Sequence, residues 1–155
     1  MAREMGLRTE LIRSKLADIE DSVSLVEVNI PQEIEEFSQL GLVKDGIYKR
    51  MEFSIESIID ILSIINSDLR LSIPEDEEDV VENLGRNGIL TQSMVDKVRR
   101  MKGFRNIIVH RYGRIDDLLA YKILTENLKD FGEFIESIEQ FLEESSARIK
   151  KLGGS

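Results

Sequence analysis

Apolar residues recur along much of this chain at alternating intervals of four and three, the spacing that places them on one face of an α-helix. One such stripe crosses residues 12–30 and another crosses 124–142. The longest lies between them and consists of Tyr48, Met51, Ile55, Ile58, Leu62, Ile65 and Leu69. Because no convincing period-two strand pattern accompanies these stripes, the sequence predicts an all-α fold.

Helix boundaries follow from residues that begin or end helices. We expect a short helical stretch over 32–40 and longer helices over about 7–29, 45–71, 75–85, 91–112 and 116–150. Pro31 ends the first helix, and Gly41 is expected as a helix C-cap. Thr91 and Asp116 are expected as N-caps. Joined by short loops, these helices predict an up-and-down bundle.

The composition limits the kinds of site that the chain can carry. With 155 residues it predicts a single domain, which we place at 1–150 with a flexible C-terminal tail at 151–155. The absence of Cys excludes disulfides and Cys-based sites, and with one His a transition-metal site would need carboxylates. We therefore expect no metal and no cofactor. The apolar runs are short and broken by charge, so we expect no membrane segment and a cytoplasmic location.

Positive charge is concentrated in one segment of this acidic chain. The net charge is −9, yet residues 97–114 hold seven of the 21 Lys and Arg residues and none of the 30 Asp and Glu residues. Such a cluster indicates an anionic ligand, most simply a phosphate backbone. The candidate contacts are Lys97, Arg100, Lys102, Arg111 and Arg114. Alternatively, this basic face pairs with acidic helices elsewhere in the fold or with an acidic partner.

The only histidine, His110, lies in this basic segment, five residues after Arg105. An imidazole titrates near neutral pH and can act as an acid or a base, although a lone His near a helix end can equally be a capping or core residue. Arg105 interrupts an apolar stripe that passes through Met101 and Ile108, where an unpaired buried guanidinium would be costly. Arg105 must therefore line a wet groove, pair with a carboxylate or face a subunit interface.

An ideal helix separates Arg105 and His110 by roughly 140°. The two side chains converge only through the long arginine, through an unwound helix end, or through a second copy of the helix in a symmetric dimer. Their chemistry suits metal-free RNA cleavage, because an imidazole can deprotonate a 2′-hydroxyl or protonate the leaving 5′-oxygen, and a guanidinium can stabilise charge on the phosphate. Because the two side chains diverge on one helix, a single chain is expected to supply half of a site.

Several motifs resemble those of the HepT-type HEPN toxins, where HEPN stands for higher eukaryotes and prokaryotes nucleotide-binding. Residues 103–112, GFRNIIVHRY, resemble the Arg-x4-His-x-Tyr signature of that family. The stretches IESIIDI at 55–61, NGILT at 87–91 and LKDF at 128–131 are similar to other parts of it. The resemblance covers roughly residues 7–143, and it implies a homodimeric all-α bundle that acts as a metal-independent endoribonuclease toxin.

The resemblance also implies roles for single residues. Arg105 and His110 would be catalytic, and Asn106 would support them. The implied partner is a minimal nucleotidyltransferase antitoxin, MntA, with which the toxin could form a higher hetero-oligomer. That enzyme would transfer AMP from ATP to the motif tyrosine, here Tyr112. The added bulk and negative charge at the mouth of a phosphate-binding cleft would repel RNA.

Two features leave alternatives open. Ser63-Ile64 stands where family members often carry Asn-His, so support from a second histidine is absent. Glu56 and Asp60 lie one turn apart and could support the site by pairing with Arg105, or they could be ordinary surface or ion-pair carboxylates. Two other functions are also compatible with the chain: a non-catalytic nucleotide- or RNA-binding adaptor associated with a nucleotidyltransferase, and a purely structural bundle without a ligand.

Overall fold

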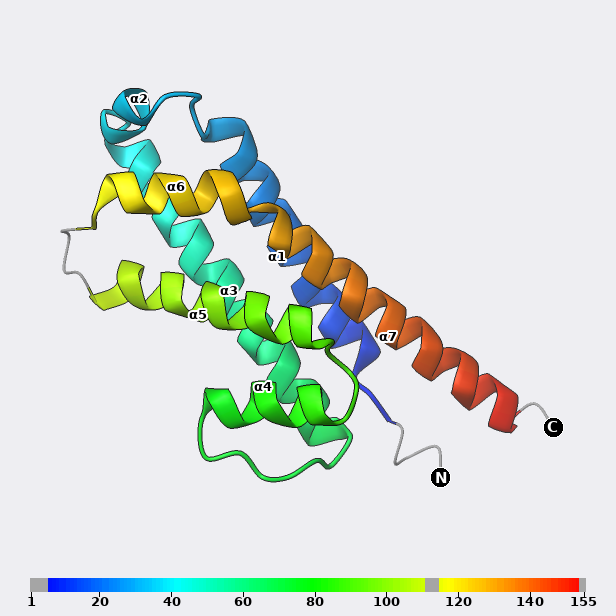
Figure 1. Ribbon diagram of the computed structural model, residues 1–155. Helices are drawn as coiled ribbons and strands as arrows, with labels where there is room; N and C mark the ends of the chain where they lie inside the picture. The colour runs from blue at the N-terminus through cyan, green and yellow to red at the C-terminus, as the bar shows by residue number, and fades with distance from the viewer. Residues whose placement is uncertain (1–5, 111–114, 154–155) are drawn as a thin grey trace.

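The computed structural model describes residues 6–110 and 115–153, with the backbone alone for His110 and for 148–153. Within these residues every regular element is an α-helix, so the expected all-α fold is confirmed (Figure 1). The helices are α1 (Thr9–Asn29), α2 (Ile34–Ser38), α3 (Leu42–Asp68), α4 (Glu77–Arg86), α5 (Gln92–His110), α6 (Asp117–Asn127) and α7 (Lys129–Gly153). None of these helices is both long enough and apolar enough to cross a membrane.

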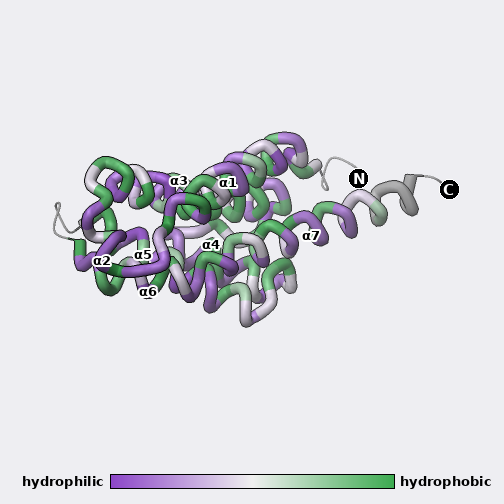
Figure 2. The backbone as a smooth tube through the Cα atoms, turned by 90° about the horizontal axis from the view of Figure 1, so that it is seen from above, coloured by the Kyte–Doolittle hydropathy of each residue, from purple (hydrophilic) through white to green (hydrophobic). Residues whose placement is uncertain are grey.

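The longest helix, α3, is the centre of the bundle. It packs against α1, α4 and α5, and α1 packs in turn against α7 (Figure 1). Its predicted stripe forms the core: fully buried residues include Met51, Ile55, Ile58, Leu62 and Ile65. Figure 2 shows hydrophobic and hydrophilic residues alternating along the helices, as expected where one face of each is buried. Each such side chain contributes roughly 1.5–3 kcal/mol of burial free energy. The buried stripe of α3 therefore stabilises the packing of α4 and α5 against this helix.

The helix ends agree with most of the expected caps. The hydroxyl of Thr91 accepts a hydrogen bond from the backbone N–H of Met94 at 3.1 Å, and Asp116 accepts from two N–H groups in the first turn of α6. Gly41 is a correction, because it stands directly before α3 as its N-cap instead of ending a helix. The chain turns sharply there, and the φ of 60° at Gly41 lies in the region that glycine adopts without strain.

The single helix expected over 116–150 is wrong, because the chain forms α6 and α7 with a break at Leu128 (Figure 1). The hydroxyl of Thr125 donates to the backbone oxygens of Tyr121 and Lys122, a contact that bends helices. The two helices also have different partners, since α6 packs on α2 and α7 packs on α1. Helix α7 continues to Gly153, into the expected C-terminal tail, and residues 154–155 lie outside the described part.

Side-chain contacts tie the start of α6 to α3. Asp117 accepts hydrogen bonds from the Tyr48 hydroxyl and from Lys44 Nζ, both at 2.7 Å. Burial and the neighbouring carboxylate of Asp117 raise the pKa of Tyr48 far above its ordinary value. Tyr121, further along α6, donates its hydroxyl to the backbone oxygen of Pro31. Both tyrosines are therefore packing residues, and they hold α6 in place just after the segment that contains the motif tyrosine.

Candidate functional site

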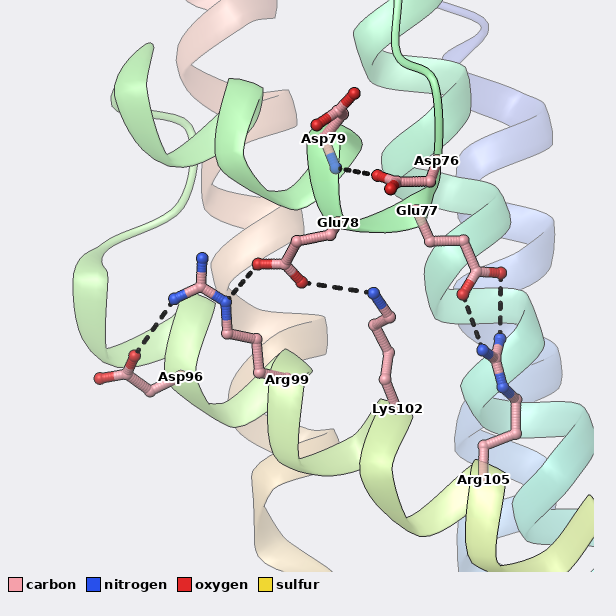
Figure 3. A network of polar contacts seen from close by, with 8 residues as sticks. All are labelled: Asp76, Glu77, Glu78, Asp79, Asp96, Arg99, Lys102 and Arg105. Carbon is pink, nitrogen blue, oxygen red and sulfur yellow. Dashed lines mark hydrogen bonds and ion pairs between the residues drawn. The ribbon is translucent and has the colours of Figure 1, made fainter. Parts of the chain in front are cut away.

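Arg105 projects from α5 toward the first turn of α4 (Figure 3). Its Nη1 and Nη2 atoms donate to the two carboxylate oxygens of Glu77, at 3.1 and 2.7 Å. The side chain of Arg105 is only 15% exposed, whereas that of Glu77 is 43% exposed. A planar two-bond contact of this kind is among the stronger charge-assisted hydrogen bonds. Of the three alternatives for Arg105, pairing with a carboxylate is confirmed.

The pair changes the acidity of both groups. Hydrogen bonding from Arg105 lowers the pKa of Glu77 below its ordinary value, against an opposing effect of burial. The same hydrogen bonds raise the pKa of Arg105, and the negative charges of Glu56 and Glu52 on α3 raise it further. Both members of the pair therefore stay charged throughout the neutral pH range.

Two more basic side chains of α5 bind the same turn of α4. Glu78 accepts from Nε of Arg99 at 2.6 Å and from Nζ of Lys102 at 3.4 Å. Arg99 also lies 3.9 Å from Asp96, one turn earlier on α5. Figure 3 shows Arg99, Lys102 and Arg105 reaching from one side of α5 to the acids at the start of α4. These ion pairs fasten α4 to α5 at successive turns.

The remaining basic residues in the described part of the segment bind α7. Lys97 forms an ion pair with Glu133, whose pKa this contact lowers. Arg100 lies 3.4 Å from Asp130, a carboxylate that is almost fully buried. Within the described residues, each Lys and Arg of the basic segment thus pairs with an acid. The explanation that this face binds acidic helices of the same fold is therefore confirmed for that part of the segment.

The rest of the predicted motif stands at the end of α5. Asn106 is exposed on that helix, and His110 is its last residue. The side chain of His110 lies outside the described part of the structure, as do Arg111, Tyr112 and Arg114. The structure thus places the arginine half of the motif, while the roles of these other residues are sequence-based expectations.

The carboxylate partner of Arg105 was not the expected one. Asp60 is exposed and lies 3.6 Å from Lys15, so it is not the group that Arg105 binds. Glu56 is exposed and acts on Arg105 through its charge, while the hydrogen bonds go to Glu77. Acids such as those at 75–79 are ordinary at a helix N-terminus, where they oppose the helix dipole, so nothing in the sequence singles out Glu77. Its contact with Arg105 depends on how α4 packs on α5.

An apolar groove of about 290 Å³ lies between α5 and the region where α6 meets α7. Its lining residues include Met101, Phe104, Ile107, Leu124 and Leu128, and Arg105 is not among them. The arginine of the motif therefore faces α4 and not this groove. Among the described residues, no group of three or more His, Cys, Asp or Glu residues is arranged to hold a metal ion.

Comparisons with known proteins agree with this arrangement. The mRNA nuclease HepT of Shewanella oneidensis is 28% identical over 130 residues, which make up 84% of this chain and 97% of that protein. A solved structure of the tri-AMPylated HEPN toxin of the same organism, in complex with an MNT antitoxin, has a TM-score of 0.74 at 28% identity and covers 83% of this chain and 96% of its own.

A more distant structure shares the fold alone. YutE of Bacillus subtilis, described as a cytosolic protein of unknown function, has a TM-score of 0.75 at 17% identity and covers 88% of this chain and 92% of its own. The family model described as ribonuclease HepT-like matches residues 19–138, a span that runs from α1 to α7 and includes Glu77, Arg105 and His110. The chain belongs to the ribonuclease HepT-like family.

Proposed function

We propose that this protein is a HepT-type toxin, a metal-independent endoribonuclease that cleaves RNA in the cytoplasm and is controlled by a nucleotidyltransferase antitoxin. One observation carries the proposal: the ribonuclease HepT-like match over 19–138 contains both Arg105 and His110. The ion pair between Arg105 and Glu77 supports it. Placing a guanidinium on an apolar stripe costs desolvation free energy, and a binding or catalytic role explains why the chain has an arginine there.

In this proposal the motif residues divide the chemistry. His110 exchanges a proton with the 2′-hydroxyl or with the leaving 5′-oxygen, and Arg105 stabilises the negative charge that develops on the phosphate. Asn106, exposed one position after Arg105, orients the substrate by hydrogen bonds. A guanidinium has about five N–H donors, of which Glu77 takes two, so Arg105 retains donors for a phosphate oxygen.

The RNA backbone meets a basic surface that is partly neutralised. Lys97, Arg100 and Lys102 are bound to acids of the same chain, so a phosphate must compete for them. The pairs of Lys97 and Lys102 are partly exposed and exchange at little cost, because each is worth about 1 kcal/mol or less. Releasing Arg100, in contrast, would leave the buried carboxylate of Asp130 unpaired. We assign the leading contacts to Arg111 and Arg114, which follow His110 in the sequence, and secondary contacts to the three paired residues.

We also propose that the working site belongs to two chains. Arg105 and His110 diverge by roughly 140° on an ideal helix, so the partner of each comes from a second copy of α5 in a symmetric homodimer. Mixing Arg105→Ala with His110→Ala tests this arrangement. After subunit exchange, half of the dimers would carry one intact composite site, and about a quarter of the wild-type activity would return. A mixture that stays inactive although mixed dimers form would contradict the two-chain site.

The antitoxin acts on Tyr112 in this proposal. The solved relative from S. oneidensis is tri-AMPylated and in complex with an MNT antitoxin, which supports a partner of the same type here, in a hetero-oligomer. AMP groups on Tyr112 would place negative charge two residues from His110 and repel RNA. Mass spectrometry of the protein co-expressed with the antitoxin should find AMP on the wild type and none on Tyr112→Phe. AMP retained by that variant would place the modification elsewhere.

The nuclease chemistry has its own test. Incubation with a single-stranded RNA oligonucleotide in excess EDTA should give cleavage, whereas the same oligonucleotide with 2′-O-methyl groups should stay intact because the attacking hydroxyl is blocked. Cleavage of both oligonucleotides would exclude attack by the 2′-hydroxyl. Binding of RNA without cleavage at any pH would instead favour the non-catalytic adaptor.

A further inference from the structure

We propose that Glu77 is a positioning residue of the nuclease site, which holds the guanidinium of Arg105 in the orientation that the substrate phosphate requires. This inference rests on the proposed function and adds to it a residue outside the signature motif. Glu77 lies in α4 and Arg105 in α5, 28 positions apart in the sequence, and two hydrogen bonds join them.

The first reason is the geometry of the contact. Glu77 binds both terminal nitrogens of Arg105, so it approaches the guanidinium from its end and fixes the plane of the group. The Nε–H of Arg105 and one further N–H on each Nη remain available for an anion. A second oxyanion can therefore bind the same guanidinium without displacing Glu77.

The second reason is that Glu77 itself stands on a rigid element. Its helix is capped by Asp76, whose side chain accepts the backbone N–H of Asp79 at 2.9 Å (Figure 3). Asp79 in turn accepts the N–H of Glu75 at 2.9 Å, so both its N–H and its carboxylate close this turn. Val81 and Leu84 of the same helix are fully buried. Positioning by a packed and capped helix is more accurate than positioning by a loop.

The third reason is what free rotation of Arg105 would cost. An arginine side chain has about 2 kcal/mol of rotamer entropy, which an unrestrained guanidinium must lose when it binds the transition state. The pair with Glu77 removes that freedom before the substrate arrives. Glu77 and Arg105 are both charged at neutral pH, so the restraint on Arg105 is present in the pH range in which an imidazole transfers protons.

The neighbouring residue provides a matched control. Glu78 lies on the same first turn of α4, and its side chain is 43% exposed, as is that of Glu77. It also forms ion pairs with α5, but to Arg99 and Lys102. Replacing either glutamate by Gln removes one negative charge from the same turn. A difference between the two variants therefore reports on the contact with Arg105 and not on local charge.

The experiment compares steady-state cleavage of RNA in EDTA by wild type, Glu77→Gln, Glu77→Asp and Glu78→Gln, with circular dichroism to confirm that each is folded. For Glu77→Gln we expect kcat to fall by about 10- to 100-fold with KM changed less than about threefold, because misplacement of a catalytic group acts on the chemical step. Glu77→Asp keeps the charge and should recover part of the loss. Glu78→Gln should keep kcat within about twofold of wild type.

A double-mutant cycle tests whether Glu77 acts through Arg105. Lysine cannot form the two-bond contact, so Glu77→Gln should lower kcat little further in an Arg105→Lys background. An equal loss in both backgrounds would overturn the positioning role, as would wild-type kcat in Glu77→Gln or equal losses in the two Gln variants. These outcomes all require an active wild type; a wild type that leaves RNA intact would contradict the proposed function itself.

Discussion

The guanidinium of Arg105 and the carboxylate of Glu77 meet in a two-bond contact, at 3.1 and 2.7 Å, that joins the second half of α5 to the first turn of α4. The contact holds the charge of Arg105 at a position of α5 where the apolar stripe would otherwise place an aliphatic side chain. Because Arg105 is mostly buried and Glu77 is partly exposed, the pair gains from hydrogen bonding without full desolvation of the carboxylate. Stability and the proposed function therefore depend on the same two residues.

The pair should make stability depend on pH in acid. The pKa of Glu77 is lowered in the folded protein from its ordinary value of 4.5, so its contribution is complete above that value and is lost as the pH falls through the lowered pKa. At neutral pH, Glu77→Gln should lower the free energy of unfolding by about 1–2 kcal/mol, reduced from the value of a buried pair because Glu77 is partly exposed. Urea unfolding at several pH values should show this difference narrowing in acid, and a constant difference would contradict the assignment.

Two buried serines should respond to alanine in opposite directions. Ser54 and Ser22 are both fully buried, but Ser22 Oγ accepts a hydrogen bond from Arg50 at 3.3 Å. Ser54 Oγ has no hydrogen-bond partner within the part of the chain that the structure describes. Ser54→Ala should therefore stabilise the protein by about 1 kcal/mol, and Ser22→Ala should destabilise it by a similar amount. Thermal melting of the two variants would refute this if both shifted in the same direction.

Two helical glycines form a second matched pair. Apart from the neighbouring residues and backbone of its own helix, a Cβ at Gly103 would meet no described atom within 4 Å, whereas one at Gly85 would lie 3.0 Å from Cγ2 of Val95. Gly103→Ala should therefore raise the free energy of unfolding by about 0.5–1 kcal/mol through helix propensity alone. Gly85→Ala should lower it, because the buried side chain of Val95 has little room to move. Denaturant titration gives both values, and a stabilised Gly85→Ala would show that the contact between α4 and α5 is loose.

The hydroxyl of Tyr48 should stabilise the placement of α6. It donates to Asp117 at 2.7 Å from a buried position, so Tyr48→Phe should cost about 1 kcal/mol. The pKa of Tyr48 is raised above its ordinary value of 10.0 in the folded protein, so stability should fall as the pH rises above that value. Unfolding measured on the alkaline side should show a weaker decline for Tyr48→Phe than for wild type. An identical decline would mean that other groups control alkaline unfolding.

The stripes of apolar residues predicted the helices because the buried residues of a helix recur at intervals of three and four, once per turn. Ile55, Ile58 and Leu62 are in the core for that reason. The break at Leu128 was not predicted because the stripe continues through it, whereas α6 and α7 differ in the helices that they contact. A periodic pattern reports which face is buried but not against what.

The candidate site was predictable in part for the same reason. Arg105 could be singled out because a charge stood in an apolar position, and His110 because it is the only histidine and lies in the basic segment; the family resemblance added Tyr112. Glu77 could not be found in this way, since an acid in the first turn of a helix is ordinary. The pairing of the basic segment with acids of α4 and α7 likewise required the packing of three helices. Charge counts predicted a cluster of cations but not their partners.

The most direct test of the account is cleavage of single-stranded RNA in EDTA by wild type, Arg105→Ala and His110→Ala, each checked for folding and measured at equal concentration. We expect the wild type to cleave and each variant to lose at least about 100-fold in rate, because one removes the cation and the other the proton-transfer group. Cleavage at the wild-type rate by either folded variant would contradict the assignment of Arg105 and His110 as the catalytic pair.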